Sequence, residues 1–99
     1  MSVLTNNTIK AKHSVRNDIA DLSSRNTYYE VKGFAVKAVC DVLFAHDMEL
    51  GLCQMPGDDG RALVPVYAAG ELYAEEIGYI CFSWYRMNSG RYEFTIYVA

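Results

Sequence analysis

Hydrophobic positions alternate along the last part of the chain, and this alternation predicts a β-hairpin over residues 77–98. Asn88-Ser89-Gly90 has the form of a three-residue loop, because glycine occupies the one position that needs a positive φ. A two-residue loop at Ser89-Gly90 would divide the apolar side chains between both faces, so we favour the longer loop. Pairing outward from it sets Tyr85 opposite Glu93 and gathers six large apolar side chains on one face: Ile80, Phe82, Trp84, Phe94, Ile96 and Val98.

The opposite face of this hairpin is rich in tyrosine. Tyrosine combines a large stiff ring with one polar tip, and it is enriched where proteins touch their partners. The alternative is that these tyrosines are ordinary strand formers, half covered by a loop or by the N-terminal segment. The face carries Cys81 and Ser83 together with five residues that we take as candidates for binding a partner: Tyr79, Tyr85, Glu93, Thr95 and Tyr97.

Helical spacing predicts two helices in the first half of the chain. Over residues 14–24, apolar side chains recur on one side at Val15, Ile19 and Leu22. Over residues 34–47, apolar side chains cover most of the surface and leave Lys37 and Asp41 on a narrow polar stripe. The valines of this second run keep a strand as the alternative. Between the two runs, residues 27–32 have the composition of a strand that ends at the following glycine.

Residues 50–68 predict a second hairpin, with strands over 50–55 and 62–68 around a loop of turn formers that carries Asp58 and Asp59. Pro65 lacks a backbone N–H, so its strand is expected at a sheet edge or at a bulge. The fold class predicted by these elements is α+β. We expect an antiparallel sheet of four to five strands, with one or two helices packed on its apolar face.

Length and composition limit this fold further. Ninety-nine residues with a hydrophobic fraction of 52% predict a single compact domain over residues 1–99, in which residues 1–12 form a polar, flexible arm. Cys40, Cys53 and Cys81 are odd in number and widely spaced, which indicates reduced thiols. With a polar start and no long apolar run, we expect a cytoplasmic protein that makes no membrane contact.

The net charge of −3 is unevenly spread along the chain. Residues 1–37 hold six Lys or Arg against three acids, whereas residues 38–99 hold three against nine. The acidic part disfavours a nucleic-acid groove and suits a partner with a basic surface, so Asp58 and Asp59 join the candidate binding residues. A solvated acidic rim is the alternative. The basic N-terminal third keeps nucleic-acid binding open as an alternative function.

We find no motif that predicts catalysis, a cofactor or a metal site. Cys40 and His46 stand close to Asp47 in sequence, but a spacing of six residues puts the thiol and the imidazole on different sides of a helix. The loop with Asp58 and Asp59 is too short to supply the alternating oxygen ligands of an EF-hand. Glycine-rich phosphate-binding loops are absent from the sequence.

Lys32-Gly33-Phe34-Ala35 resembles the start of the RNA-recognition-motif signature, in which a basic residue, a glycine and aromatic residues on a strand stack RNA bases. The resemblance covers four residues. Val36, Lys37 and Val39 then stand where that motif has an aromatic, an aliphatic and a final aromatic residue. The stacking platform that this resemblance implies is therefore incomplete.

These observations predict a non-enzymatic, protein-binding module that blocks its target by steric occlusion. In general character the chain is similar to small inhibitors carried by phages and mobile elements, such as anti-CRISPR or immunity proteins. This is a similarity of type that rests on size, charge pattern and the lack of reaction machinery. A homodimer built through the tyrosine-rich face, with a structural or regulatory role, is the alternative.

Overall fold

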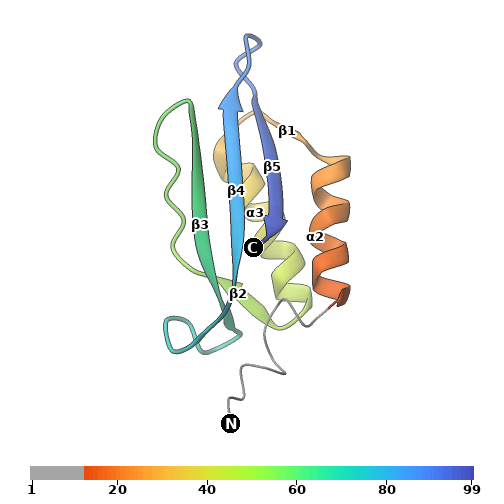
Figure 1. Ribbon diagram of the computed structural model, residues 1–99, viewed down its shortest axis with the longest axis vertical. Helices are drawn as coiled ribbons and strands as arrows, with labels where there is room; N and C mark the ends of the chain where they lie inside the picture. The colour runs from red at the N-terminus through yellow and green to blue at the C-terminus, as the bar shows by residue number, and fades with distance from the viewer. Residues whose placement is uncertain (1–12) are drawn as a thin grey trace.

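The computed structural model describes residues 13–99 (Figure 1). They form one five-stranded antiparallel sheet in the order β1-β5-β4-β3-β2, with two helices. This is the α+β fold that the sequence predicts, whereas the expected arm over residues 1–12 lies outside the described residues. In chain order the elements are α2 (His13–Arg25), β1 (Tyr28–Tyr29), α3 (Lys32–Ala45), β2 (Met48–Leu50), β3 (Asp59–Ala68), β4 (Glu76–Arg86) and β5 (Tyr92–Val98).

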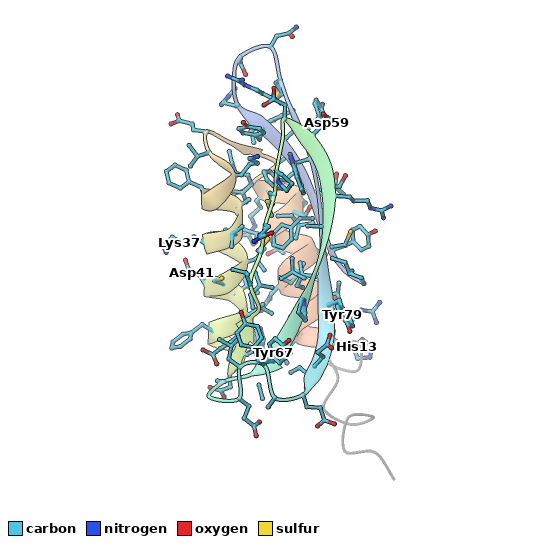
Figure 2. The ribbon with its side chains drawn as sticks, turned by 90° about the vertical axis from the view of Figure 1, so that its left-hand side faces the viewer. His13, Lys37, Asp41, Asp59, Tyr67 and Tyr79 are labelled. Carbon is cyan, nitrogen blue, oxygen red and sulfur yellow. The ribbon has the colours of Figure 1, made fainter. Side chains whose placement is uncertain are left out.

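Both helices cover the same face of the curved sheet, and the other face carries no helix (Figures 1 and 2). The core lies between the two layers. Each layer contributes fully buried side chains, with Ile19 and Leu43 on the helices and Phe82 and Phe94 on the strands. The Phe82 and Phe94 rings meet edge to face, and Trp84 stacks on Phe94 at 6.1 Å between ring centroids. We call the helix-covered side the inner face of the sheet and the opposite side its outer face.

The C-terminal hairpin has the predicted loop and the predicted register. Gly90 adopts a φ of 91°, and its N–H donates to the Met87 carbonyl over 2.9 Å. The pairs Trp84 with Phe94 and Tyr85 with Glu93 are those expected from the three-residue loop. All six predicted apolar residues therefore point toward the helices, and only Val98, at the end of β5, is less than fully covered.

Helix α2 confirms the predicted helix over residues 14–24 with one more residue at each end. Val15 and Ile19 are fully buried, and Leu22 packs against the core from the same side. The helix also reaches the edge of the sheet. The backbone N–H of Ile96 on β5 donates to the Ser23 hydroxyl over 3.2 Å, and that of Phe94 donates to the Thr27 carbonyl over 2.7 Å.

The segment between residues 27 and 47 differs from its prediction at both ends. Only Tyr28–Tyr29 is a strand, and α3 begins at Lys32, two residues before the predicted start, and ends two residues early. The strand alternative for this run is wrong. Lys32 explains the early start, since its ammonium donates to the carbonyls of Met55 and Gly57 and lies over the Trp84 ring at 5.8 Å. These contacts of the Lys32 ammonium hold the first turn of α3 against the sheet.

The predicted hairpin over residues 50–68 is correct in its pairing partners and wrong in the extent of its strands. β2 pairs with β3 from Met48 to Leu50 only, and residues 51–55 are not a strand. Pro65 gives the reason. Its carbonyl accepts the Gly51 N–H over 2.8 Å, but it has no N–H to return a bond, so the ladder stops there. β3 instead extends back to Asp59 along β4, with a register shift at Val66.

Candidate functional site

Five of the seven candidate residues come together on the outer face of the sheet. Register places Tyr79 and Tyr85 on β4 and Glu93, Thr95 and Tyr97 on β5, all on the side away from the helices. All three tyrosines are partly exposed: Tyr79, Tyr85 and Tyr97 are 37%, 48% and 40% exposed. Among the described residues no helix lies over this face, and the N-terminal segment over residues 1–12, which the half-covered alternative invokes, lies outside the described residues.

Two neighbouring strands add residues to this face that the sequence alone did not bring there. Tyr28 of β1 pairs with Glu93, and Arg61 and Leu63 of β3 pair with Ser83 and Cys81. Leu63 is 60% exposed and Tyr28 is 49% exposed. In the sequence, the alternation of Arg61, Leu63 and Pro65 indicates that these side chains share one face of a strand. It does not indicate which strand lies next to that strand, so it could not place them on the outer face.

Hydrogen bonds hold the polar tips of this face in place. The Arg61 guanidinium donates to the Tyr97 hydroxyl over 2.6 Å, and its hydrogen bonds to Cys81 and Tyr97 raise the pKa of Arg61. A hydrogen bond to Glu93 raises the pKa of Tyr85, and one to Glu76 raises that of Tyr79. Each of these two phenols thus has a carboxylate acceptor beside it on the outer face.

The acidic candidates lie at the end of the sheet where β4 and β5 are joined. Asp59 is the first residue of β3 and pairs with Tyr85, so its side chain shares the row of that tyrosine. Asp58 precedes it, with a carboxylate oxygen 3.8 Å from the Arg86 guanidinium. The loop predicted over residues 56–61 is thus displaced toward the N-terminus and lengthened to residues 51–58, since β2 ends at Leu50 and Asp59 already belongs to β3. Asp59 therefore adjoins the tyrosines of the outer face, whereas Asp58 contacts Arg86, which alternates with Tyr85 along β4 and so belongs to the inner-face set.

A shallow hollow lies in the middle of the outer face. It is bordered by side chains from all three long strands, and its floor is formed by Cys81, which is only 4% exposed. The rim has an apolar side at Leu63 and a polar side at the Arg61–Tyr97 pair. Its lining residues are Arg61, Ala62, Leu63, Cys81, Tyr97 and Ala99.

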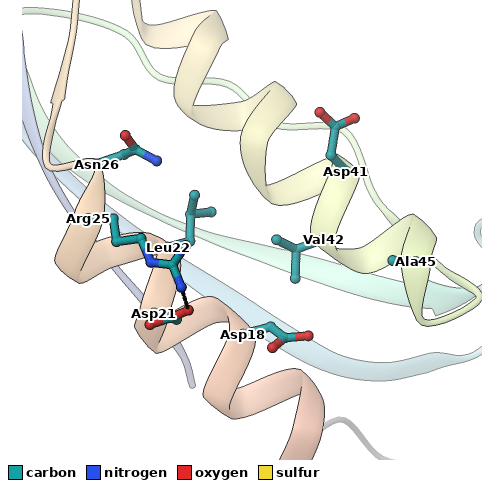
Figure 3. Close-up of a pocket in the computed structure, with 8 residues that line it drawn as sticks. All are labelled: Asp18, Asp21, Leu22, Arg25, Asn26, Asp41, Val42 and Ala45. Carbon is teal, nitrogen blue, oxygen red and sulfur yellow. Dashed lines mark hydrogen bonds and ion pairs between the residues drawn. The ribbon is translucent and has the colours of Figure 1, made fainter.

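A second depression runs between α2 and α3 (Figure 3). Three carboxylates border it, and each has a cationic or imidazole partner. Asp21 pairs with Arg25, Asp41 lies 2.9 Å from the Lys37 ammonium, and Asp18 lies 2.7 Å from His46. The His46–Asp18 contact joins α2 to the end of α3, whereas the other two pairs each lie within one helix.

His46 follows α3 and bonds to both helices. Its backbone N–H caps α3, with a 2.9 Å bond to the Leu43 carbonyl, and its side chain reaches α2. Within residues 13–99, no three His, Cys, Asp or Glu side chains lie close enough together to hold a metal ion.

Three basic side chains of the N-terminal third have polar partners within the described residues. Arg25 and Lys37 pair with aspartates on their own helices, and Lys32 is held by carbonyls. Lys10 and Lys12 lie outside the described residues. The resemblance to the RNA-recognition motif also fails here, because Lys32-Gly33-Phe34-Ala35 forms the first turn of a helix and not a strand.

No known family model matches this chain, and comparisons with curated proteins and with solved structures give no match either. Neither helix of the described part is long and apolar enough to cross a bilayer.

Proposed function

We propose that this chain is a non-enzymatic module that binds another protein through the outer face of its sheet and inhibits it by steric occlusion. The observation that carries the proposal is the open row of aromatic side chains on a helix-free face. Tyr28, Tyr79, Tyr85 and Tyr97 are each more than a third exposed there, with Leu63 beside them. Such contiguous exposed aromatic and apolar surface is typical of a protein interface.

The charges of this face favour a partner with a basic surface. Asp59 stands at one end of it with Asp58 just before it in sequence, and Glu93 lies between two tyrosines. Carboxylates at the rim of an interface steer a basic partner during association, whereas the aromatic rings supply the contact area. Arg61 is held by Tyr97 and Cys81, so it presents an ordered donor in the centre.

Cys40, Cys53 and Cys81 are free thiols in the structure, which supports a reducing compartment such as the cytoplasm as the place of action. The small size and uneven charge fit the inhibitors that phages and mobile elements carry. The proposed mechanism needs no reaction at the face, because covering a functional surface of the target is sufficient.

Affinity capture from the native host tests this function. The triple variant Tyr79→Ser, Tyr85→Ser, Tyr97→Ser should lose the partner, since it removes three rings without touching the core. The matched control Leu52→Ser, Leu72→Ser removes two side chains, 70% and 43% exposed, that lie outside the strands, and it should capture the partner like the wild type. Circular dichroism must show the same fold for all three proteins.

Equal capture by the triple variant and the control would overturn the proposal for this face. Inhibition is tested separately on the captured partner, whose own activity should fall in proportion to its occupancy by the module. A partner that stays fully active when saturated would rule out steric occlusion. The on-rate should also fall with added salt, and Asp58→Asn with Asp59→Asn should make that fall shallower.

A further inference from the structure

The side of α3 that faces away from the sheet carries two large exposed rings. Phe34 is 55% exposed and Phe44 is 74% exposed, the highest value among the large apolar side chains of residues 13–99. Between them on the same side lie Lys37 and Asp41, which project away from the sheet (Figure 2). The buried residues Ala35, Val39 and Leu43 occupy the opposite side of the helix. We call Phe34, Lys37, Asp41 and Phe44 the α3 stripe.

The spacing of the α3 stripe is that of a coiled-coil seam. Steps of three, four and three residues correspond to successive a and d positions of a heptad, and on an α-helix they form one narrow strip. A helix that is apolar on its exposed side as well as its buried side usually packs against something on both. The sequence alone did not separate these rings from the core, because apolar side chains were expected over most of the surface of this helix.

The stripe is also complementary to itself. A two-fold axis perpendicular to the helix at the level of Val39 relates Phe34 to Phe44 and Lys37 to Asp41, since each pair is equally far from Val39 in sequence. In an antiparallel pair of such helices, a positions meet d positions of the other helix. Phe34 would then contact the partner copy's ring at position 44, and each Lys37 would face a carboxylate. An isologous interface needs this reciprocity.

We propose that the α3 stripe is a homodimer interface, in which two copies of this chain pack their α3 helices antiparallel. The partner is a second copy of this chain. When two α3 stripes pack antiparallel, each aromatic ring lies against an aromatic ring and each Lys37 lies against a carboxylate. The Lys37 and Asp41 side chains are 73% and 67% exposed, so both are available to a second molecule. In the monomer they pair with each other at 2.9 Å, and in the dimer the four charges form one network.

This dimer leaves the proposed binding face free. α3 lies on the inner side of the sheet and the stripe points further outward, so the outer faces of the two copies would look away from each other (Figure 2). A helix of 14 residues is about 21 Å long, which limits the contact to the size of a weak, concentration-dependent interface. The inference does not depend on the proposed function.

Sedimentation with charge-reversal variants tests the proposal. The wild type should move from monomer to dimer as concentration rises. Lys37→Asp places acid against acid and Asp41→Lys places base against base, so each should weaken dimerisation by about tenfold or more. The double variant Lys37→Asp, Asp41→Lys restores both pairs and should dimerise like the wild type. An equimolar mixture of the two single variants should form the heterodimer in preference to either homodimer.

The opposite results would overturn the proposal. If the wild type stays monomeric up to about 1 mM, the α3 stripe is not a homodimer interface. A dimer that survives both reversals, or that the double variant does not recover, is held by another surface. Phe44→Ser is the second arm, and it should abolish the dimer with no change in fold, because that ring makes no part of the core. If the dimer is lost when the outer-face tyrosines are replaced and not when Phe44 is replaced, the dimer interface lies on the outer face of the sheet.

Discussion

The two faces of the sheet are built from alternate residues of the same strands, yet they have opposite character. On the inner face, Phe82 and Phe94 are fully buried and pack ring against ring. On the outer face, Tyr85 and Tyr97 expose nearly half of their surface and are tied only at their hydroxyls. This sheet therefore packs the core on one side and leaves aromatic side chains of the other side exposed.

The largest effect should come from removing an inner ring. Phe82→Ala deletes a fully buried ring and should lower the free energy of unfolding by about 3–5 kcal/mol, measured by urea denaturation. Tyr85→Ala on the outer face of the same strand is the matched control and should cost less than about 1 kcal/mol. Similar losses for both variants would show that the outer face is also part of the packed structure.

A smaller loss of stability should follow when a methyl group is added on the crowded inner face of the sheet. Gly60 lies opposite Trp84, and a Cβ added there would lie 2.9 Å from the indole ring. Gly60→Ala should therefore lower the free energy of unfolding by about 1–3 kcal/mol. Gly33→Ala in α3 meets nothing within 4 Å and should raise it by up to about 1 kcal/mol. Thermal unfolding distinguishes the two, and the same sign for both would contradict this account of Gly60.

The smallest change in stability should come from removing a buried polar group on the inner side, the Tyr29 hydroxyl. The Tyr29 hydroxyl is buried without a hydrogen-bond partner among the described residues, and burial raises the pKa of Tyr29. Tyr29→Phe should raise the free energy of unfolding by about 1 kcal/mol, because it removes an unsatisfied group and keeps the ring against Phe94. Tyr85→Phe, which removes an exposed hydroxyl, should change it by less than about 0.5 kcal/mol. A loss of stability in Tyr29→Phe would mean that this hydroxyl is bonded in solution.

The parts of the fold that could be read from the sequence are those set by local interactions. The glycine of the Asn88-Ser89-Gly90 loop and the pairing that starts from it determine the register of β4 and β5, so both faces of that hairpin followed. The spacing of Val15, Ile19 and Leu22 likewise determined α2. In each case the residues that decide the structure lie within one element or across one short loop.

The parts that could not be read depend on contacts between distant segments. Lys32 starts α3 early because it reaches carbonyls more than twenty residues away, at Met55 and Gly57. The end of β2 depends on Pro65 in another strand. The same limit applies to the candidate site, since Arg61 and Leu63 join the outer face only through the β3–β4 register, which no local pattern specifies.

The outward amides of β5 are already occupied, and this affects how the sheet can meet other chains. Tyr92 pairs with β1, the Phe94 N–H is taken by the Thr27 carbonyl, and the Ile96 N–H is taken by the Ser23 hydroxyl of α2. A foreign strand therefore finds few free donors on that side from which to extend the sheet toward an amyloid-like stack. The β5 edge is thus occupied from Tyr92 to Ile96, next to the exposed aromatic rings of the outer face.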